Sequence, residues 1–395
     1  MYEKRRGEQK RMKKVFCMIL AVVMVLAFST TALAASISVP VTTMATGSET
    51  AAGGQISYTH ADKLGTYEAG AVQTVTFAEP GVAIVAMAFA AGTTASSVEF
   101  GLYTDAALNT PVGASYNYGR LSGNTALDTA VYSVNAGTYY LGAKSGSYSS
   151  SNYTVQLGAA VGFCKSGDRT LSNNKMSAVG VRTDGQTNRF KFKATKNGYV
   201  TVSFADFNGK VTLLNSKKKA ISDKISVNTG SSYGSAATKR AVFGVKKGQT
   251  YYIKTEASSY KPSAYQIKYK QTAITDKSGA KRSKALNMKK NKTYKGIATA
   301  GYSTNDWYKI KLTKKQVLNL YVKMDGSDKM ALTIYNSKGR KISATTLTRS
   351  SDFGATQKFY SMVNYKRAKW SKGTYYVKIS TTSKKDSGYY TLKWK

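Results

Sequence analysis

The sequence is poor in cysteine, histidine and proline, and each shortage excludes a class of protein. Its 395 residues include two Cys, one His and four Pro. Zinc sites built from several His or Cys are therefore excluded. Because Cys17 lies in the N-terminal leader, an internal disulfide is excluded from the remaining chain, which keeps only Cys164. We interpret Cys164 as a small apolar residue, with a disulfide between chains as the alternative.

Acidic residues are also scarce, and the shortage is confined to one part of the chain. Asp and Glu number 20 against 59 Lys and Arg, which gives a formal net charge of +39. Residues 36–160 carry 3 basic and 7 acidic residues, a net charge of −4, whereas residues 161–395 carry 49 and 11, a net charge of +38. So large an excess exceeds what solubility needs and destabilises a compact fold through self-repulsion. It predicts a polyanionic partner.

The first residues differ in character from the rest of the chain. Basic residues precede an apolar run from Val15 to Phe28, and Ala32 and Ala34 supply the small side chains that signal peptidase requires. We predict a cleaved signal peptide over residues 1–34 and a secreted or extracellular protein. An uncleaved membrane anchor is the alternative, although the apolar run is short for a span. Contact with a membrane is expected only through this segment.

Three stretches with adjacent Tyr residues repeat one pattern, and each is followed by a second alternating run. The pairs of runs are Gly137–Leu141 with Tyr153–Leu157, Gly248–Ile253 with Tyr265–Tyr269, and Gly373–Val377 with Tyr390–Trp394. Successive side chains of a strand point to opposite faces, so Val377 should point inward and Lys378 outward. The short spacing predicts that each pair closes a domain as a β-hairpin.

Composition and repetition together predict an all-β protein of three domains. Thr, Ser, Val, Tyr and Gly abound, and helical periodicity is nearly absent after the leader. With three copies of the terminal pattern, we predict domains over residues 35–160, 161–271 and 272–395.

The domains differ on their surfaces more than in their cores. Arg189–Thr195 aligns with Trp307–Thr313, and Gln73–Phe77 occupies the same place in the first domain. Inward positions stay apolar, as at Phe190 and Tyr308. Outward positions change from Thr in the first domain to Lys in the other two, at Lys191, Lys193, Lys309 and Lys311.

The order of motifs in the last domain resembles a known family. The motifs are Tyr294–Gly296, Asn305–Ile310, Leu332–Asn336, Lys372–Val377 and Ser387–Tyr390. This order resembles bacterial pre-peptidase C-terminal domains, best over residues 272–395 and less over the preceding domains. The resemblance implies jelly-roll-like β-sandwiches, which in that family are appended to secreted proteases and other surface proteins. We expect no catalytic domain before the repeats.

Residues suited to catalysis are few, and we predict that the protein is not an enzyme. His60, in a polar stretch, is interpreted as a surface loop residue, so a Ser-His-Asp site would depend on it alone. Acids of the basic domains fall in turn-like contexts such as Asp184, Asp325 and Asp386. The alternative is a hydrolase site in the first domain, for which the scattered acids are Glu68, Glu79, Glu99, Asp105 and Asp128.

We predict no cofactor, with calcium as the alternative that the resemblance raises. Some relatives, notably collagen-binding domains of clostridial collagenases, use a calcium site near the start of the domain. Here the ligands could be Asp276, Asp306, Asp325 and Asp328, but no run resembles a calcium loop and the surrounding Lys would oppose the ion.

The predicted function is that of a non-catalytic, secreted or cell-surface binding protein. Its partners would be an anionic polysaccharide or a teichoic-acid-like polymer, a host glycan or extracellular matrix, with no specific nucleic acid. Lys greatly outnumbers Arg, which favours loose, salt-sensitive binding. The candidate ligand-binding residues are Lys191, Lys193, Lys254, Lys309, Lys311, Lys378, Tyr252, Tyr376 and Trp307.

The outward aromatic residues leave two further hypotheses open. Tyr252, Tyr376 and Trp307 could recognise a carbohydrate or a collagen-like peptide specifically, or they could be structural residues covered by Lys stems. The protein could also be ancillary to a hydrolase.

Overall fold

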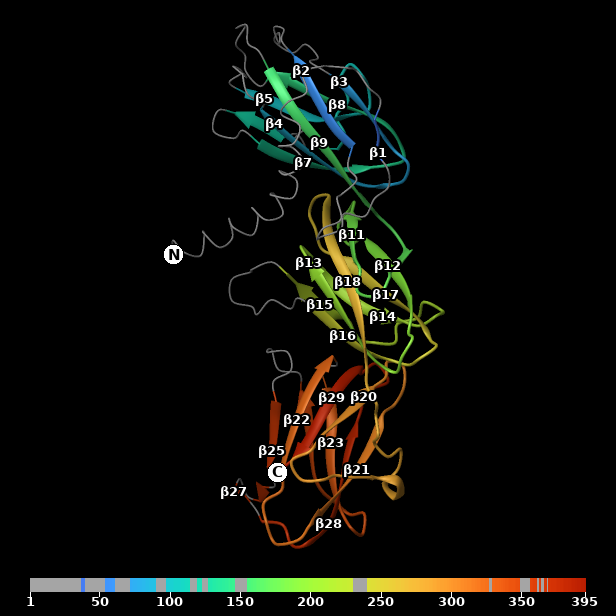
Figure 1. Cartoon of the computed structure of the whole chain (residues 1–395), viewed down its shortest axis with the longest axis vertical. Helices are drawn as coiled ribbons and strands as arrows, with labels where there is room; N and C mark the ends of the chain where they lie inside the picture. The colour runs from blue at the N-terminus through green and yellow to red at the C-terminus, as the bar shows by residue number, and fades with distance from the viewer. Residues whose placement is uncertain are drawn as a thin grey trace. The chain divides into compact units, whose positions relative to one another are not determined.

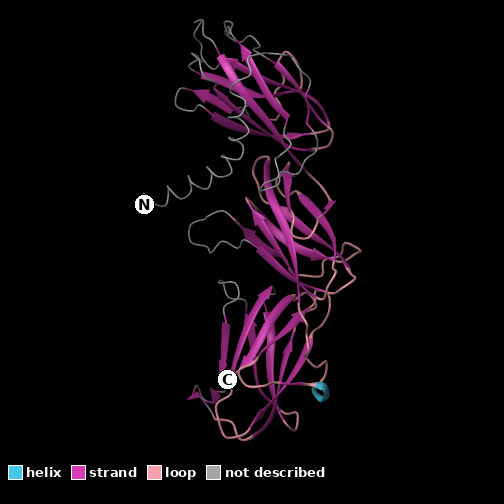
Figure 2. Ribbon diagram, in the orientation of Figure 1, coloured by secondary structure: helices cyan, strands magenta, loops and turns pink. Residues whose placement is uncertain are grey.

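The fold is described here from a computed structural model of the 395-residue chain (Figures 1 and 2). The residues that it describes are 37–39, 54–60, 72–89, 97–113, 119–122, 127–145, 155–229, 240–326, 329–348, 356–360, 362–363, 366–367 and 369–395. The predicted signal peptide lies outside these ranges. Within them, no helix has both the length and the apolar character that a bilayer span requires.

The described residues form strands and one 3-10 turn, η1 (Arg282–Lys284), which confirms the all-β prediction. They fall into two compact units. The first holds Met1–Gly167, Ser177–Gln186 and Ser258–Tyr265, and the second Asp168–Met176, Thr187–Ala257 and Gln266–Lys395. The division into domains at residues 35–160, 161–271 and 272–395 stays a prediction.

The first pair of sheets has the strand orders β1-β3-β8-β5-β6 and β2-β9-β4-β7. The strands are β1 (Ile37–Val39), β2 (Gly54–His60), β3 (Val72–Phe77), β4 (Gly81–Phe89), β5 (Ser97–Tyr103), β6 (Gly119–Ser122), β7 (Leu127–Val134), β8 (Gly137–Ser145) and β9 (Val155–Lys165). The rings of Phe77 on β3 and Phe163 on β9 stack at 5.3 Å and so join the two sheets.

The second pair has the same pattern, with the orders β10-β12-β17-β14-β15 and β11-β18-β13-β16. The strands are β10 (Arg169–Thr170), β11 (Met176–Val181), β12 (Thr187–Lys193), β13 (Gly198–Ala205), β14 (Asn208–Leu214), β15 (Ile225–Asn228), β16 (Arg240–Val245), β17 (Thr250–Ala257) and β18 (Ser263–Ala273). Phe192 on β12 and Tyr269 on β18 bring their rings to 4.9 Å across the core.

The third pair has the orders β19-β21-β28-β23-β24 and β20-β29-β22-β25. The strands are β19 (Leu286–Asn287), β20 (Thr293–Ala298), β21 (Asn305–Leu312), β22 (Asn319–Gly326), β23 (Lys329–Asn336), β24 (Lys341–Thr348), β25 (Thr356–Tyr360), β28 (Gly373–Ser380) and β29 (Gly388–Trp394), with the extra hairpin β26 (Met362–Val363) and β27 (Lys366–Arg367). One continuous core cluster draws on both sheets, including Tyr308, Val322, Ile379 and Leu392.

This strand order identifies each pair of sheets as a jelly roll. Eight strands pass back and forth between two four-stranded layers in the same order three times. The remaining short strand of each set, β1, β10 or β19, runs parallel to β3, β12 or β21 at the edge of the five-stranded sheet. The predicted jelly-roll-like β-sandwich class is therefore confirmed.

The predicted closing hairpins are wrong. β28 pairs with β21 and β23, whereas β29 pairs with β20 and β22 in the opposite sheet. The strands β8 and β9, and likewise β17 and β18, are also placed in different sheets. Alternation identifies which side chains face the core but not which sheet a strand joins, so two strands that face each other across a core carry the same pattern as a hairpin.

The inward and outward faces follow the alternation as predicted. Val377 and Ile379 on β28 are fully buried, and Tyr390 and Leu392 on β29 are buried opposite them. Cys164 is also fully buried, on β9 opposite Val82, which agrees with its interpretation as a small apolar residue.

A buried polar network lies inside the third jelly roll. The Tyr390 hydroxyl donates to Asp306 Oδ2 at 2.5 Å and lies 2.9 Å from the Tyr308 hydroxyl. Burial, with the nearby Asp276 carboxylate as a second cause, raises the pKa of Asp306 to about 7. A carboxyl group with a raised pKa is neutral in the folded state where it is already charged in the unfolded chain.

Asp306→Asn is expected to abolish the fall in the free energy of unfolding that the Asp306 carboxyl causes as the pH rises toward neutral. In the wild type, the free energy of unfolding should fall as pH rises from about 4 to about 7, by at most about 1.4 kcal/mol per pH unit from this group, because the folded state holds the proton longer. Asn cannot ionise and can still accept the Tyr390 hydrogen bond. All three Trp residues belong to the third jelly roll, so urea unfolding followed by Trp fluorescence reports on it. If the free energy of unfolding depended on pH in the same way in the wild type and in Asp306→Asn, the raised pKa of Asp306 would be contradicted.

Candidate functional site

The candidate residues of the second jelly roll lie together on the outer face of its five-stranded sheet. Lys191 and Lys193 alternate with buried Phe on β12, and Tyr252 and Lys254 alternate with buried residues on β17. Lys191 lies directly opposite Tyr252 in the antiparallel register. The four residues predicted from separate segments therefore form one surface.

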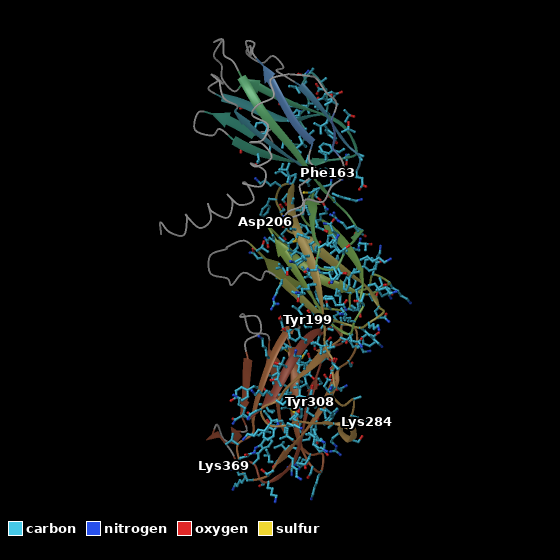
Figure 3. All side chains as sticks on the ribbon, viewed as in Figure 1. Phe163, Tyr199, Asp206, Lys284, Tyr308 and Lys369 are labelled. Carbon is cyan, nitrogen blue, oxygen red and sulfur yellow. The ribbon has the colours of Figure 1, made fainter. Side chains whose placement is uncertain are left out.

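The other five candidates lie on the corresponding face of the third jelly roll. Lys378 lies opposite Trp307, and Tyr376 lies opposite Lys309, so cations and aromatic rings face each other across β21 and β28. Lys311 is exposed at the end of the row. Figure 3 shows how the side chains divide, with Tyr308 buried inside this sandwich and Lys284 and Lys369 exposed outside it.

Each of the three candidate aromatic rings carries a cation over its face. Lys218 Nζ lies 5.5 Å from the ring centroid of Tyr252, and Lys378 Nζ lies 5.8 Å from the ring of Trp307. The guanidinium carbon of Arg282 lies 5.6 Å from the ring of Tyr376. Cation–π attraction orients these long side chains, and a sugar could stack on the same ring faces only by displacing them.

Three residues of these surfaces escaped the sequence analysis. Tyr335 on β23 lies opposite Tyr376, and its ring centroid is 5.2 Å from that of Trp307. The alternation of β23 could have placed Tyr335 outward. Lys218, in a turn, and Arg282, in η1, reach their rings from outside the paired strands, and no local pattern marks such contacts.

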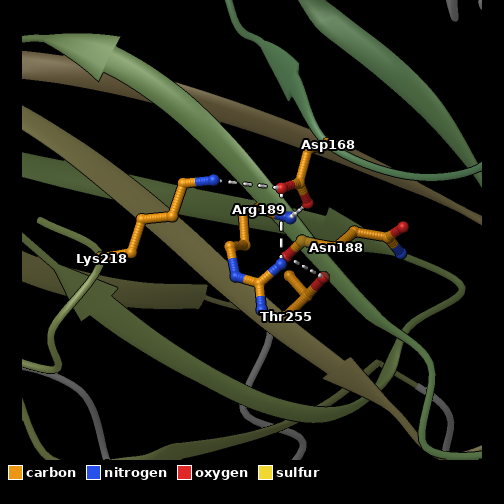
Figure 4. A network of polar contacts seen from close by, with 5 residues as sticks. All are labelled: Asp168, Asn188, Arg189, Lys218 and Thr255. Atoms are coloured by element: carbon orange, nitrogen blue, oxygen red, sulfur yellow. Dashed lines mark hydrogen bonds and ion pairs between the residues drawn. The ribbon is translucent and has the colours of Figure 1, made fainter. Parts of the chain in front are cut away.

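Carboxylates neutralise part of the face of the second jelly roll. Asp168 accepts a hydrogen bond from the Arg189 backbone nitrogen at 2.8 Å, and its Oδ2 lies 3.4 Å from Arg189 Nη1 and 3.9 Å from Lys218 Nζ (Figure 4). Beside this group, Thr255 donates to the Asn188 carbonyl oxygen at 3.4 Å. Asp168 therefore anchors two cations at one edge of the sheet.

Glu256, near the C-terminal end of β17, has the same effect. Its carboxylate forms ion pairs with Lys254 at 2.5 Å and Lys224 at 3.0 Å. These hydrogen bonds, that of Lys254 first, hold the pKa of Glu256 below its usual value. On the equivalent face of the third jelly roll, by contrast, no described carboxylate lies within 4 Å of Lys309, Lys311 or Lys378.

Lysines also cover the outer faces of the four-stranded sheets. In the third jelly roll these are Lys295 on β20, Lys323 on β22 and Lys393 on β29, and in the second Lys268 and Lys270 on β18. Charge alone therefore does not distinguish one face. The four-stranded sheet of the third jelly roll also has one cation over an aromatic ring, Lys395 Nζ at 5.1 Å from the ring centroid of Tyr321, whereas its five-stranded face has two, at Trp307 and Tyr376. In the first jelly roll, Tyr140 instead lies opposite the uncharged Thr74 and Tyr103.

The described calcium candidates do not gather into a group of three, although Asp276 lies near Asp306. Asp276 accepts hydrogen bonds from the backbone of Ser278 and Ile297, and Asp306 belongs to the buried network. Asp328 lies outside the described residues. No group of three or more His, Cys, Asp or Glu suited to a metal ion occurs in the part of the chain that the structure describes.

Asp325 is not the turn residue that its Asp-Gly context predicted. It is buried on β22 and forms a 2.7 Å ion pair with Arg240 of β16. Tertiary packing with the second jelly roll overrides the local turn signal. Asp386 is a turn residue as predicted, because its carboxylate accepts backbone hydrogen bonds from Thr382 and Ser383.

The residues considered for catalysis in the first jelly roll have separate places. His60 ends strand β2 opposite Val155, so its interpretation as a loop residue is wrong. Asp105 accepts backbone hydrogen bonds in a turn, which lower its pKa, and Glu79 pairs with Lys165. Asp128 bonds the backbone of Thr129. Glu99 lies on β5, and Glu68 lies outside the described residues.

Comparisons with known proteins identify no family. No family model and no curated protein matches the sequence. Among solved structures, the chain is similar to an archaeal virus turret protein with a triple jelly-roll fold, at 10% identity and a TM-score of 0.19 over 86% of this chain and 87% of the other. It is also similar to Arthrobacter globiformis T6 isomalto-dextranase in complex with panose, at 9% identity and a TM-score of 0.18 over 57% of this chain and 35% of the other. A third similar structure is the CUB1-EGF-CUB2 region of human MASP-1/3, at 7% identity and a TM-score of 0.17 over 55% of this chain and 99% of the other. Because these TM-scores are low, the jelly-roll assignment depends on the strand order alone.

Proposed function

We propose that this is a non-catalytic, secreted or cell-surface protein that adheres through its Lys-rich sandwich faces to anionic polymers of a cell envelope or a host. The observation that carries the proposal is the face of the third jelly roll, where cations are ordered by aromatic rings without described carboxylate partners. A binding role of this kind is in keeping with the resemblance to pre-peptidase C-terminal domains, which occur in secreted and surface proteins.

The physical argument is that the uncompensated charge raises the free energy of the isolated protein. Residues 161–395 carry a net charge of +38, and mutual repulsion among these groups opposes compact folding. A polyanion relieves the repulsion and releases its own condensed counterions on binding. Two basic sandwiches in one chain also add avidity toward a repeating polymer.

Binding to a polyanion is expected to collapse as salt is added. The affinity of the full chain for dextran sulfate or polyphosphate should fall by about a hundredfold or more between 50 and 200 mM NaCl, because several ionic contacts are lost together. Binding held mainly by aromatic stacking would persist. Titration by fluorescence anisotropy at four salt concentrations measures the slope, and a flat salt dependence would contradict the electrostatic proposal.

The two faces of the third jelly roll provide a matched comparison. Lys309→Gln with Lys311→Gln and Lys378→Gln removes the same charge as Lys295→Gln with Lys323→Gln and Lys393→Gln on the four-stranded sheet. The first triple variant should weaken binding by about tenfold more than the second, because Lys378 is pre-oriented over Trp307 and loses less entropy on binding, and Lys309 lies beside the Arg282–Tyr376 pair. Equal losses would show that charge acts without a preferred face.

Removing an internal acid should strengthen binding. Glu256→Gln releases Lys254 and Lys224 from their ion pairs, so the affinity for a polyanion should rise by about two- to fivefold, as expected for freeing exposed charges. The matched control is Asp223→Asn, an exposed acid of the same jelly roll that is in none of the ion pairs described. An equal gain for both variants would contradict a specific role of Glu256.

A further inference from the structure

We propose that Arg282, Tyr376 and Lys309, named here the Arg282 corner, form a subsite for one sulfate or phosphate group of the polymer. The inference rests on the proposed function and says where on the protein one anionic group of the polymer would bind. Arg282 comes from η1, Tyr376 from β28 and Lys309 from β21, so three separate segments of the third jelly roll meet at one ring.

Arg282 is held in place by its surroundings. Its guanidinium lies 5.6 Å from the Tyr376 ring centroid and packs against Gly339 in the turn between β23 and β24. A Cβ atom at Gly339 would lie 1.7 Å from Arg282 Nη1, so a residue with a side chain would displace the guanidinium. Gly339 also has a φ of +82°, a conformation that glycine adopts without strain. The absence of a side chain at Gly339 therefore leaves the space that the Arg282 guanidinium occupies.

Lys309 supplies the second cation. It lies directly across the ladder from Tyr376, so Arg282 and Lys309 both adjoin the same tyrosine. Two basic residues thus lie beside one half-buried tyrosine, and none of the described carboxylates is at ion-pair distance from either.

The second jelly roll has an equivalent corner that is built from different residues. Tyr252 occupies the place of Tyr376, and Lys191 lies opposite it as Lys309 does. The cation over the ring is Lys218, which comes from the turn after β14 and not from the segment before the edge strand. The same position is thus filled by a cation from two unrelated segments, which points to a requirement at that position. Asp168, 3.9 Å from Lys218 Nζ, already provides a counter-charge there, so the third jelly roll holds the open site.

The chemistry of the Arg282 corner fits a tetrahedral oxyanion. A guanidinium presents a planar fork of N–H donors that matches two oxygens of a sulfate or phosphate group. Such a group directs its remaining oxygens elsewhere and can bind the Lys309 ammonium at the same time. A carboxylate has only two oxygens, so once both accept hydrogen bonds from the Arg282 fork no further oxygen is left for the Lys309 ammonium.

The test compares four variants of the full chain on three polymers at one salt concentration. Arg282→Gln and Lys309→Gln remove one charge each, Arg282→Lys keeps the charge but removes the fork, and Lys323→Gln removes one charge from the opposite sheet. The probes are dextran sulfate, polyphosphate and hyaluronate, which carry sulfate, phosphate and carboxylate groups. Binding is measured by surface plasmon resonance, with thermal unfolding to establish that each variant is folded.

The three variants of the Arg282 corner are expected to lose about tenfold in affinity for dextran sulfate, polyphosphate or both, against about twofold for Lys323→Gln, because a forked charge-assisted contact is lost. Losses on hyaluronate should stay near twofold for all four variants, as for a diffuse charge. If affinity falls for only one of dextran sulfate and polyphosphate, the anionic group of that polymer, sulfate or phosphate, is the group that the Arg282 corner binds. The inference is overturned if Arg282→Gln and Lys323→Gln lose equally, or if Arg282→Lys is unaffected, while the wild type still binds. Failure of the wild type to bind any of the polymers at low salt would overturn the proposed function as well.

Discussion

Packing between the two sheets of each jelly roll is the constraint on which the rest of the structure depends. Phe77 against Phe163 and Phe192 against Tyr269 join opposite sheets, and the third sandwich has one continuous core cluster. Cys164 is the only Cys beyond the predicted signal peptide, so burial of apolar side chains is expected to replace disulfides as the source of stability. These cores must outweigh the repulsion among the surface cations.

The cost of that repulsion is reduced by where the cations lie. Lys218 and Lys378 rest over aromatic rings, so their stems cover apolar surface while their charges stay in water. Glu256 and Asp168 compensate part of the second jelly roll. The third sandwich lacks such described partners on the equivalent face, which makes it the more exposed of the two to any anion in solution.

How far the sequence predicts this structure depends on the range of the interactions. Alternation along β12 and β28 places Phe190 and Val377 inward and Lys191 and Lys378 outward, since it is a local property. It cannot say which sheet a strand joins, and for that reason the hairpins were wrongly predicted. Asp325 pairs with a residue 85 positions away, and Arg282 reaches its ring from η1, so neither contact leaves a local signal.

The pairing of β20 with β29 has a consequence for how the third jelly roll folds. Thr293 lies opposite Lys393, so the first and last of the eight jelly-roll strands meet across about 100 residues of chain, and β2 and β9 meet across a similar separation. Closing such long loops costs entropy before the contacts repay it, and proteins dominated by distant pairings fold slowly. During that interval the same like charges that strain the native state keep neighbouring unfolded chains apart, which protects against aggregation.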